Sequence, residues 1–179
     1  MDKRLSFAYG RTLMTTRIFV LVALLALFAV ALAFSPSFSA LSTAAFGGVL
    51  AAYFVLFAVS PLLTEHWVTR SRIILRQGWY FRAVILFSDI ENVGVGDEMS
   101  RARVPLGIHR PFGQPALFVT GGRTNLVSIR LREPRRFWQS FGLLANEIVF
   151  DVVDRAGFLA AVEERRGLLA PVQADRANA

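Results

Sequence analysis

A long uncharged stretch constrains this chain more than any other feature of its sequence. No Asp, Glu, Lys, Arg or His occurs at positions 18–64, although 18% of all residues are Asp, Glu, Lys or Arg. Two apolar runs, 18–34 and 40–63, fill this stretch, and each is long enough to cross a bilayer as a helix. The residues between them suffice only for the turn of an antiparallel helical hairpin. We therefore expect two transmembrane helices, with the lipid bilayer as the first partner of the chain.

A cleaved signal peptide is the alternative interpretation of the first run. A basic start, an apolar run and Ala31-Leu32-Ala33 together imitate such a peptide and its cleavage site. The second apolar run follows so closely that a hairpin is the favoured interpretation.

The positions of the charges predict how the hairpin is oriented. Residues 1–17 form a basic N-terminus, the turn at 35–39 is uncharged, and arginines follow the second run closely. These are Arg70, Arg72, Arg76 and Arg82. Because positively charged flanks stay in the cytoplasm, we expect a multi-pass protein of the cell (inner or plasma) membrane with both termini cytoplasmic.

Small residues recur along one face of the second predicted helix. Ala44, Gly48, Ala51 and Ala52 follow the spacing i, i+4, i+7, i+8, which allows another helix to approach closely. We favour packing against the first helix, with self-association as the alternative. Neither run has an ionisable group at positions 18–63, so a proton relay or ion path has no residue to carry it.

From residue 65 the pattern changes to short β-branched and aromatic runs separated by turn residues, which is typical of an antiparallel sheet. Asp154 is the predicted N-cap of a helix at 155–166, whose stripe of Phe158, Leu159 and Val162 would cover an open end of the sheet. The segment 121–125 is expected to close a hairpin between the fifth and sixth strands. Seven strands are predicted, at 65–70, 72–77, 79–87, 90–96, 116–120, 126–131 and 147–153. The domain then covers 65–167, and 168–179 is expected to be a disordered tail.

Three segments carry a resemblance to a known family. Residues 66–78 (HWVTRSRIILRQG) resemble the y-x-v-T-x-x-R-l-i-x-x-x-G opening of the bacterial and archaeal PH-like domains of the YdbS/YdbT type (DUF304). Residues 88–93 (SDIENV) resemble the s-D-I-x-x-V that follows it, and 154–162 (DRAGFLAAV) are similar to the start of its closing helix. The resemblance implies a PH-like seven-stranded β-sandwich or barrel capped by a C-terminal helix, here placed directly after a membrane α-hairpin.

Two segments depart from that pattern. Residues 97–115 are a long connection, and residues 133–146 (EPRRFWQSFGLLAN) insert a predicted short helix before the last strand. The alternative is that this short helix is itself the closing helix, with 147–166 as an appendage.

Recognisable catalytic groupings are missing from the sequence. Cysteine is absent, and there is no P-loop, G-x-G-x-x-G or H-E-x-x-H motif. A metal site on His66 and His109 would need a well placed carboxylate, so we expect an interfacial His66 and a loop His109 instead. Asp89, two residues before Glu91, is interpreted as a turn residue. We therefore predict a protein that is not an enzyme, with no cofactor and no metal site.

The polar segment 101–113 holds the predicted ligand-binding residues Arg101, Arg103 and Arg110. Their guanidinium groups can bind phosphates while the apolar residues between them enter the headgroup region. A solvated loop is the favoured alternative. A second cluster is a possible basic and aromatic rim facing the membrane: Arg130, Arg132, Arg135, Arg136, Phe137 and Trp138. Acids interspersed among the arginines make nucleic acid an unfavourable partner.

The function predicted from these observations is that of a noncatalytic, membrane-anchored PH-like adaptor or assembly platform. Its expected partners are a protein or anionic lipid headgroups, and a membrane-protein partner or a homo-oligomer is compatible with the small-residue face. The alternative is an accessory subunit of a membrane transporter or of an envelope-stress complex.

Overall fold

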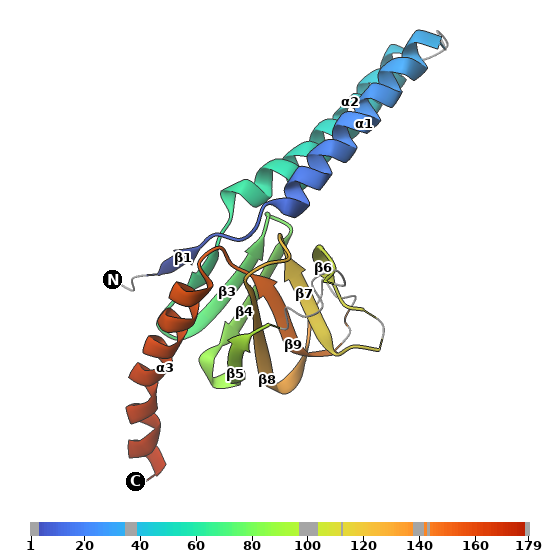
Figure 1. Ribbon diagram of the computed structural model, residues 1–179. Helices are drawn as coiled ribbons and strands as arrows, with labels where there is room; N and C mark the ends of the chain where they lie inside the picture. The colour runs from blue at the N-terminus through green and yellow to red at the C-terminus, as the bar shows by residue number, and fades with distance from the viewer. Residues whose placement is uncertain are drawn as a thin grey trace.

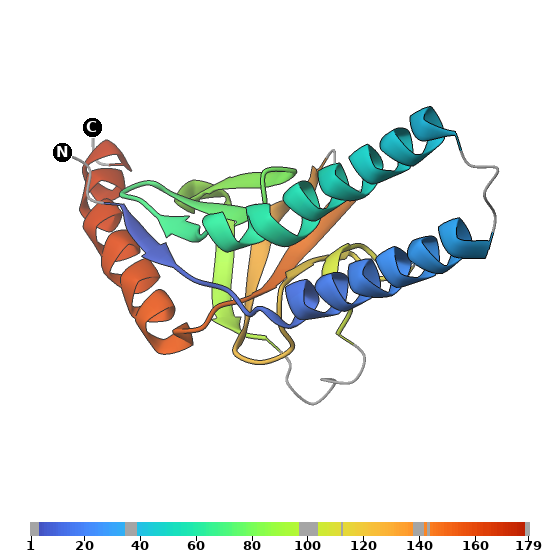
Figure 2. The ribbon, with the colours of Figure 1, turned by 90° about the horizontal axis from the view of Figure 1, so that it is seen from above.

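The computed structural model describes residues 4–34, 39–96, 104–111, 113–137, 142 and 144–177, with side chains up to residue 168. A helical hairpin projects from one end of a pair of β-sheets, and a C-terminal helix flanks the other end (Figures 1 and 2). The fold therefore combines a membrane-type α-hairpin with a mainly-β domain, as predicted.

The hairpin consists of α1 (Thr12–Phe34) and α2 (Ala40–Phe54), and α2 continues through a π-helical turn (Val55–Val59) and a 3₁₀ turn (Ser60–Leu63). Both spans are long and apolar enough to cross a membrane. Only 6% of the most apolar window in α1 and 22% of that in the second span are buried, unlike the core helix of a soluble protein. These features indicate a membrane location. α1 begins at Thr12 rather than at residue 18.

Nine strands form two sheets in the described part of the chain. The first sheet has the order β1-β2-β3-β4, and the second has the order β5-β8-β9-β7-β6. The strands of the first sheet are β1 (Leu5–Phe7), β2 (His66–Val68), β3 (Arg72–Gln77) and β4 (Phe81–Leu86). Those of the second are β5 (Ile90–Val95), β6 (Gly107–His109), β7 (Ala116–Thr120), β8 (Leu126–Arg136) and β9 (Leu144–Asp151).

All seven predicted strands are present, but two further strands were missed. β6 lies within the stretch 97–115 that was expected to be a connection. β1 precedes the hairpin and pairs antiparallel with β2, Ser6 lying opposite Trp67. The β domain is therefore not confined to 65–167, because it also takes a strand from the N-terminal segment.

The predicted hairpin between β7 and β8 is wrong. β9 lies between these two strands and pairs parallel with β7 and antiparallel with β8. The segment 121–125 instead crosses from one side of β9 to the other. Parallel pairing of β7 and β9 also departs from the purely antiparallel sheet expected from the sequence.

The short helix predicted at 133–146 is also wrong where the chain is described. β8 continues to Arg136, after a register shift between Arg130 and Arg135, and β9 begins at Leu144. Burial of Phe137 and Ala145 in the core holds both strand extensions in place. The alternative that this segment is the closing helix fails with it. Residues 138–141 and 143 lie outside the described part of the chain.

The closing helix is α3 (Arg155–Ala177), and its predicted N-cap is confirmed. The Oδ1 atom of Asp154 accepts a 2.9 Å hydrogen bond from the backbone N–H of Gly157. Phe158 and Val162 are buried in the main core, and Leu159 packs against it. α3 extends beyond residue 166, so the tail predicted to be disordered is helical as far as Ala177.

The main core lies between the two sheets and α3. Phe158 contacts Phe7 of β1 and Phe150 of β9 edge to face, with ring centroids 5.2 and 5.3 Å apart. A strand that comes before the hairpin, a strand near the end of the chain and the closing helix therefore share one core.

Candidate functional site

The end of α2 leaves backbone carbonyls that need partners from outside the helix. Pro61 has no N–H and so cannot bond the carbonyl of Phe57 four residues earlier. The guanidinium of Arg17 in α1 donates to that carbonyl instead, at 3.1 Å, and to the hydroxyl of Tyr80 at 2.7 Å. The hydroxyl of Ser60 donates to the carbonyl of Leu56. These bonds fix the two helices to each other and to the sheet.

The Tyr9 hydroxyl makes a second connection between hairpin and sheets. It donates to the carbonyl of Pro61 at 2.7 Å and lies 2.9 Å from the hydroxyl of Thr64. That hydroxyl accepts a 2.9 Å bond from the N–H of Gly78, in the turn between β3 and β4. Tyr9 is buried, and this burial raises the pKa of its hydroxyl above the ordinary value of 10.0.

A buried carboxylate ties the chain before α1 to the second sheet. Asp151, at the end of β9, accepts hydrogen bonds from the N–H groups of Gly10 at 2.6 Å and Gly121 at 2.5 Å. Burial raises the pKa of Asp151 above 3.8, although these backbone donors oppose the increase. A Cβ atom at Gly121 would collide with the carbonyl of Gly10, so this approach requires glycine.

His66 lies in the core beside this connection rather than at the membrane interface. Its ring stacks on Tyr9 at 5.1 Å and meets Phe150 edge to face at 5.3 Å. Its Nδ1 accepts a 3.2 Å bond from the N–H of Arg76. Burial lowers the pKa of His66 from 6.5 to about 3, which keeps the imidazole neutral. His109 lies in β6 and not in a loop.

We call this set of contacts the junction, defined by Tyr9, Arg17, Ser60, Thr64 and Asp151 with their partners. Its side chains come from both flanks of the hairpin and from both sheets. Tyr9, Asp151 and His66, whose pKa values are clearly shifted, are buried here and their contacts stabilise the fold. The junction is therefore a connector that sets the position of the domain relative to the hairpin.

A groove of about 850 Å³ lies between β5, the edge strand of the second sheet, and α3. Val93, Leu159 and Val162 supply apolar lining, while Arg132, Glu163 and Arg166 supply charge. The volume lies within the range of about 300–1,000 Å³ that is typical of ligand sites.

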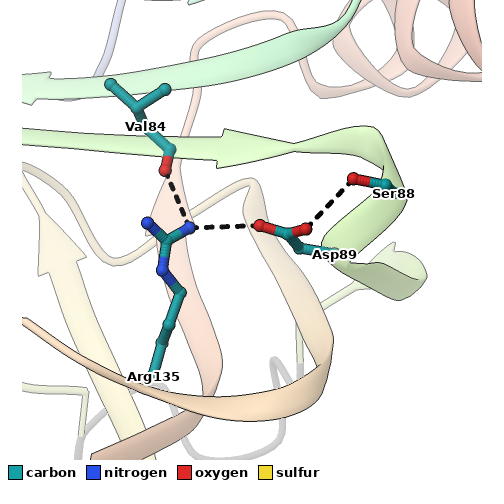
Figure 3. Close-up of polar contacts among 4 residues, drawn as sticks. All are labelled: Val84, Ser88, Asp89 and Arg135. Atoms are coloured by element: carbon teal, nitrogen blue, oxygen red, sulfur yellow. Dashed lines mark hydrogen bonds and ion pairs between the residues drawn. The ribbon is translucent and has the colours of Figure 1, made fainter.

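An ion pair between Arg135 and Asp89 lies next to Ser88, one of the residues that line the groove (Figure 3). Arg135 of β8 lies 3.3 Å from the carboxylate of Asp89 and donates to the carbonyl of Val84 in β4 at 3.1 Å. Ser88, which lines the groove, donates to the other oxygen of Asp89 at 3.0 Å. Asp89 thus ends a turn before β5, as predicted. The pair connects β8 of the second sheet to the turn that follows β4, the edge strand of the first sheet.

The groove faces away from the hairpin. The turn of β3 and β4 contacts the junction, whereas Phe87, which lines the groove, follows the opposite end of β4. At about 3.3 Å per residue, the six-residue strand β4 separates the two by roughly 20 Å. In both views α3 lies at the opposite end of the molecule from the hairpin (Figures 1 and 2).

Of the three predicted ligand-binding arginines, Arg110 alone lies in the described part of the chain. Arg101 and Arg103 lie outside the described residues. The Nε of Arg110 donates to the carbonyl of Leu144 at 2.8 Å, at the start of β9, whereas Asp151 at the end of β9 reaches the junction. Arg110 directly follows β6, and β6 begins at Gly107, where a Cβ atom would lie 3.7 Å from Leu13 of α1.

The described residues of the predicted basic and aromatic rim do not gather beside the hairpin. Arg135 and Arg136 lie at the end of β8 remote from the junction, and Phe137 is buried. Arg132 lines the groove. The inward orientation of Phe137 could not be seen from its sequence neighbours, and Trp138 lies outside the described residues.

The small-residue face of α2 is exposed. Ala44, Gly48, Ala51 and Ala52 all point to the surface, and a Cβ atom at Gly48 would meet no atom within 4 Å. These residues are therefore not buried against α1. The α1 contact uses larger side chains, such as the rings of Phe28 and Phe46, which are tilted by 36° to each other with centroids 4.2 Å apart.

Neither the groove nor the junction was predicted from the sequence, because each is formed by residues that are far apart in it. Among the described residues, no group of three or more His, Asp or Glu side chains could hold a metal ion. The groove combines polar and charged side chains with a few apolar ones. Comparison with protein-family models, curated proteins and solved structures found no match to this chain.

Proposed function

We propose that this chain is a noncatalytic, membrane-anchored adaptor whose PH-like domain binds a segment of a protein partner in the groove between β5 and α3. The observation that carries the proposal is the junction. Because it locks the hairpin to both sheets, it holds the groove at a set distance from the membrane, on the cytoplasmic side by the charge distribution. A flexible tether would not need buried bonds of this kind.

The groove supports an extended peptide as the occupant. β5 is the edge strand of its sheet, and an edge strand can pair with an added strand from another chain. Val93 and Leu159 offer apolar contacts, and two arginines against one glutamate favour a segment with acidic residues.

Site-specific photo-crosslinking in native membranes tests this function. A photoreactive residue at Asn92, which is exposed in the groove, should give a protein adduct of defined mass. The same residue at exposed Gln114, outside the groove, is the matched control and should give none. Ser88→Trp should fill the groove and remove the adduct. If Asn92 yields only lipid adducts or none, the groove is not a protein-binding site.

A second candidate function is that of an accessory subunit of a membrane complex. Exposure of the Ala44 and Gly48 face favours it, because a helix of another protein can approach there closely. Gly48→Leu should then reduce co-purification of a membrane partner, or of a second copy, from mild detergent. Val49→Leu on the neighbouring exposed position should leave co-purification unchanged. Equal recovery with both variants would remove this candidate.

A further inference from the structure

The turn between β3 and β4 lies against the ends of both membrane helices. The N–H of Trp79 donates to the hydroxyl of Ser60 at 3.1 Å, and the N–H of Gly78 donates to that of Thr64 at 2.9 Å. Tyr80 is bonded to Arg17 of α1. The turn is thus fixed at the depth where the second span ends, and β3 and β4 reach the base of the hairpin in Figure 1.

Large apolar side chains are exposed at this level. The Trp79 side chain is 57% exposed. Leu62 and Leu63, at the end of the second span, are 45% and 65% exposed. Tryptophan prefers the membrane–water interface, where its ring is partly apolar and its N–H remains near water. The bond to the end of a membrane span and the exposure of its ring put Trp79 in a position that suits that interface.

Basic side chains lie next to this turn on β3 and β4. Arg76 and Arg82 are directly opposite each other in the register of β3 and β4. Arg82 is exposed, three residues from Trp79, so its backbone lies within about 10 Å of the turn. The guanidinium of Arg76 lies 4.6 Å from the ring of Trp67, which holds it on the outer face of the sheet. Neither strand contains an acid.

We propose that the β3–β4 turn is an interfacial anchor with a binding site for anionic phospholipid headgroups. Trp79 enters the headgroup layer, and Arg76 and Arg82 bind lipid phosphates. The distance from the turn to Arg82 is about one Debye length at physiological ionic strength, so the leaflet charge acts on both arginines. This site is separate from the groove.

Quenching of tryptophan fluorescence by brominated lipids tests the anchor. The full chain with Trp67→Phe and Trp138→Phe keeps only Trp79 and is placed in lipid nanodiscs. Its emission should be strongly quenched, whereas a chain that keeps only Trp67 should be quenched much less. If Trp79 is quenched no more than Trp67, the turn is not in the interface and the anchor is wrong.

Native mass spectrometry of the full chain from detergent with equal phosphatidylglycerol and phosphatidylcholine tests the headgroup site. Arg76→Gln with Arg82→Gln should lower retained phosphatidylglycerol by about fivefold for each arginine. Arg130→Gln with Arg136→Gln removes the same charge at positions away from the junction and should change retention little. Arg76→Lys with Arg82→Lys should restore retention and exclude misfolding as the cause.

Equal phosphatidylglycerol retention by the parent chain and the Arg76→Gln/Arg82→Gln variant would overturn the headgroup site. If the variant in addition loses a co-purifying acidic protein, these arginines bind a protein partner instead.

Discussion

At the scale of single residues, His66 makes the stability of the domain depend on pH. Its imidazole is 1% exposed, has its Nδ1 occupied by the N–H of Arg76, and is neutral because burial lowers its pKa to about 3. An unfolded histidine has the ordinary pKa of 6.5. The folded state therefore binds fewer protons than the unfolded state between these two values, and acid favours unfolding.

We expect the free energy of unfolding to be constant for this group above pH 6.5 and to fall as the pH drops from 6.5 toward 3. The slope is at most about 1.4 kcal/mol per pH unit. Near-ultraviolet circular dichroism of the full chain in detergent, heated at several pH values, measures it. His66→Phe should remove most of the slope, while His109→Phe at an exposed position should retain it. An unchanged slope in His66→Phe would contradict this assignment.

Arg17 shows why a charged side chain lies inside the first turns of a membrane helix. It supplies the donor that Pro61 cannot provide to the carbonyl of Phe57, and it lies 5.3 and 5.6 Å from the rings of Phe57 and Tyr80. An unpaired buried carbonyl costs about 1–3 kcal/mol. A methionine of similar length would leave that carbonyl unpaired.

Arg17→Met should therefore destabilise the packing of the hairpin on the sheets by about 1–3 kcal/mol. Hydrogen exchange in detergent should show faster exchange at residues 55–64 and 78–80 than in the parent chain. Arg11→Met, at an exposed position before α1, is the control with the same loss of charge. Equal exchange in both variants would show that Arg17 does not hold the junction.

At the scale of elements, β1 extends the β domain to residues that precede the hairpin. This three-residue strand pairs with β2, and Phe7 contacts Phe158 of the closing helix. A fragment that starts at residue 65 lacks this strand, Tyr9 and Gly10. It therefore exposes the edge of β2 and leaves Asp151 without a donor from Gly10.

A soluble version of the domain should need β1. We expect residues 4–11, joined by a short Gly/Ser linker to 64–177, to fold as a monomer with a β-type circular dichroism spectrum. The termini to be joined are close, since Arg11 and Thr64 line one small pocket. The fragment 65–177 should be protease-sensitive or aggregate. If it is as resistant as the linked chain, β1 is dispensable.

At the scale of the whole molecule, hairpin and domain act as one unit with the groove and the β3–β4 turn at opposite ends. The turn reaches the membrane level and the groove faces away from it. A partner held in the groove would therefore be positioned relative to the bilayer without an intervening flexible linker.

The orientation of this unit follows from its charges and can be measured. Cysteines introduced at Ser37, in the turn between the spans, and at Thr124, in the domain, should react differently with a membrane-impermeant reagent in intact cells. Only the Ser37 position should be labelled. Labelling of the Thr124 position would reverse the orientation, and labelling after membrane disruption provides the control for accessibility.

The sequence by itself determined the elements whose signals are local. Two apolar runs are sufficient to predict the hairpin, because a span requires only length and apolarity. Short β-branched and aromatic runs between turn residues placed β3 and β7 at their observed bounds, and Asp154 marked the start of α3 through a bond to a residue three positions away. The PH-like assignment and the lipid contacts of Arg101, Arg103 and Arg110 stay predictions.

Tertiary structure alone decided which elements become neighbours. β1 is too short to show a period. It is a strand only because it pairs with β2, from which the whole hairpin separates it in the sequence. The insertion of β9 between β7 and β8 depends on burial of Ile148 and Phe150 in the shared core. The junction and the groove consist of residues distant in sequence, and no local propensity encodes a contact between Tyr9 and Pro61. Packing of the shared core selects such contacts, because burying apolar surface from distant segments outweighs local preference.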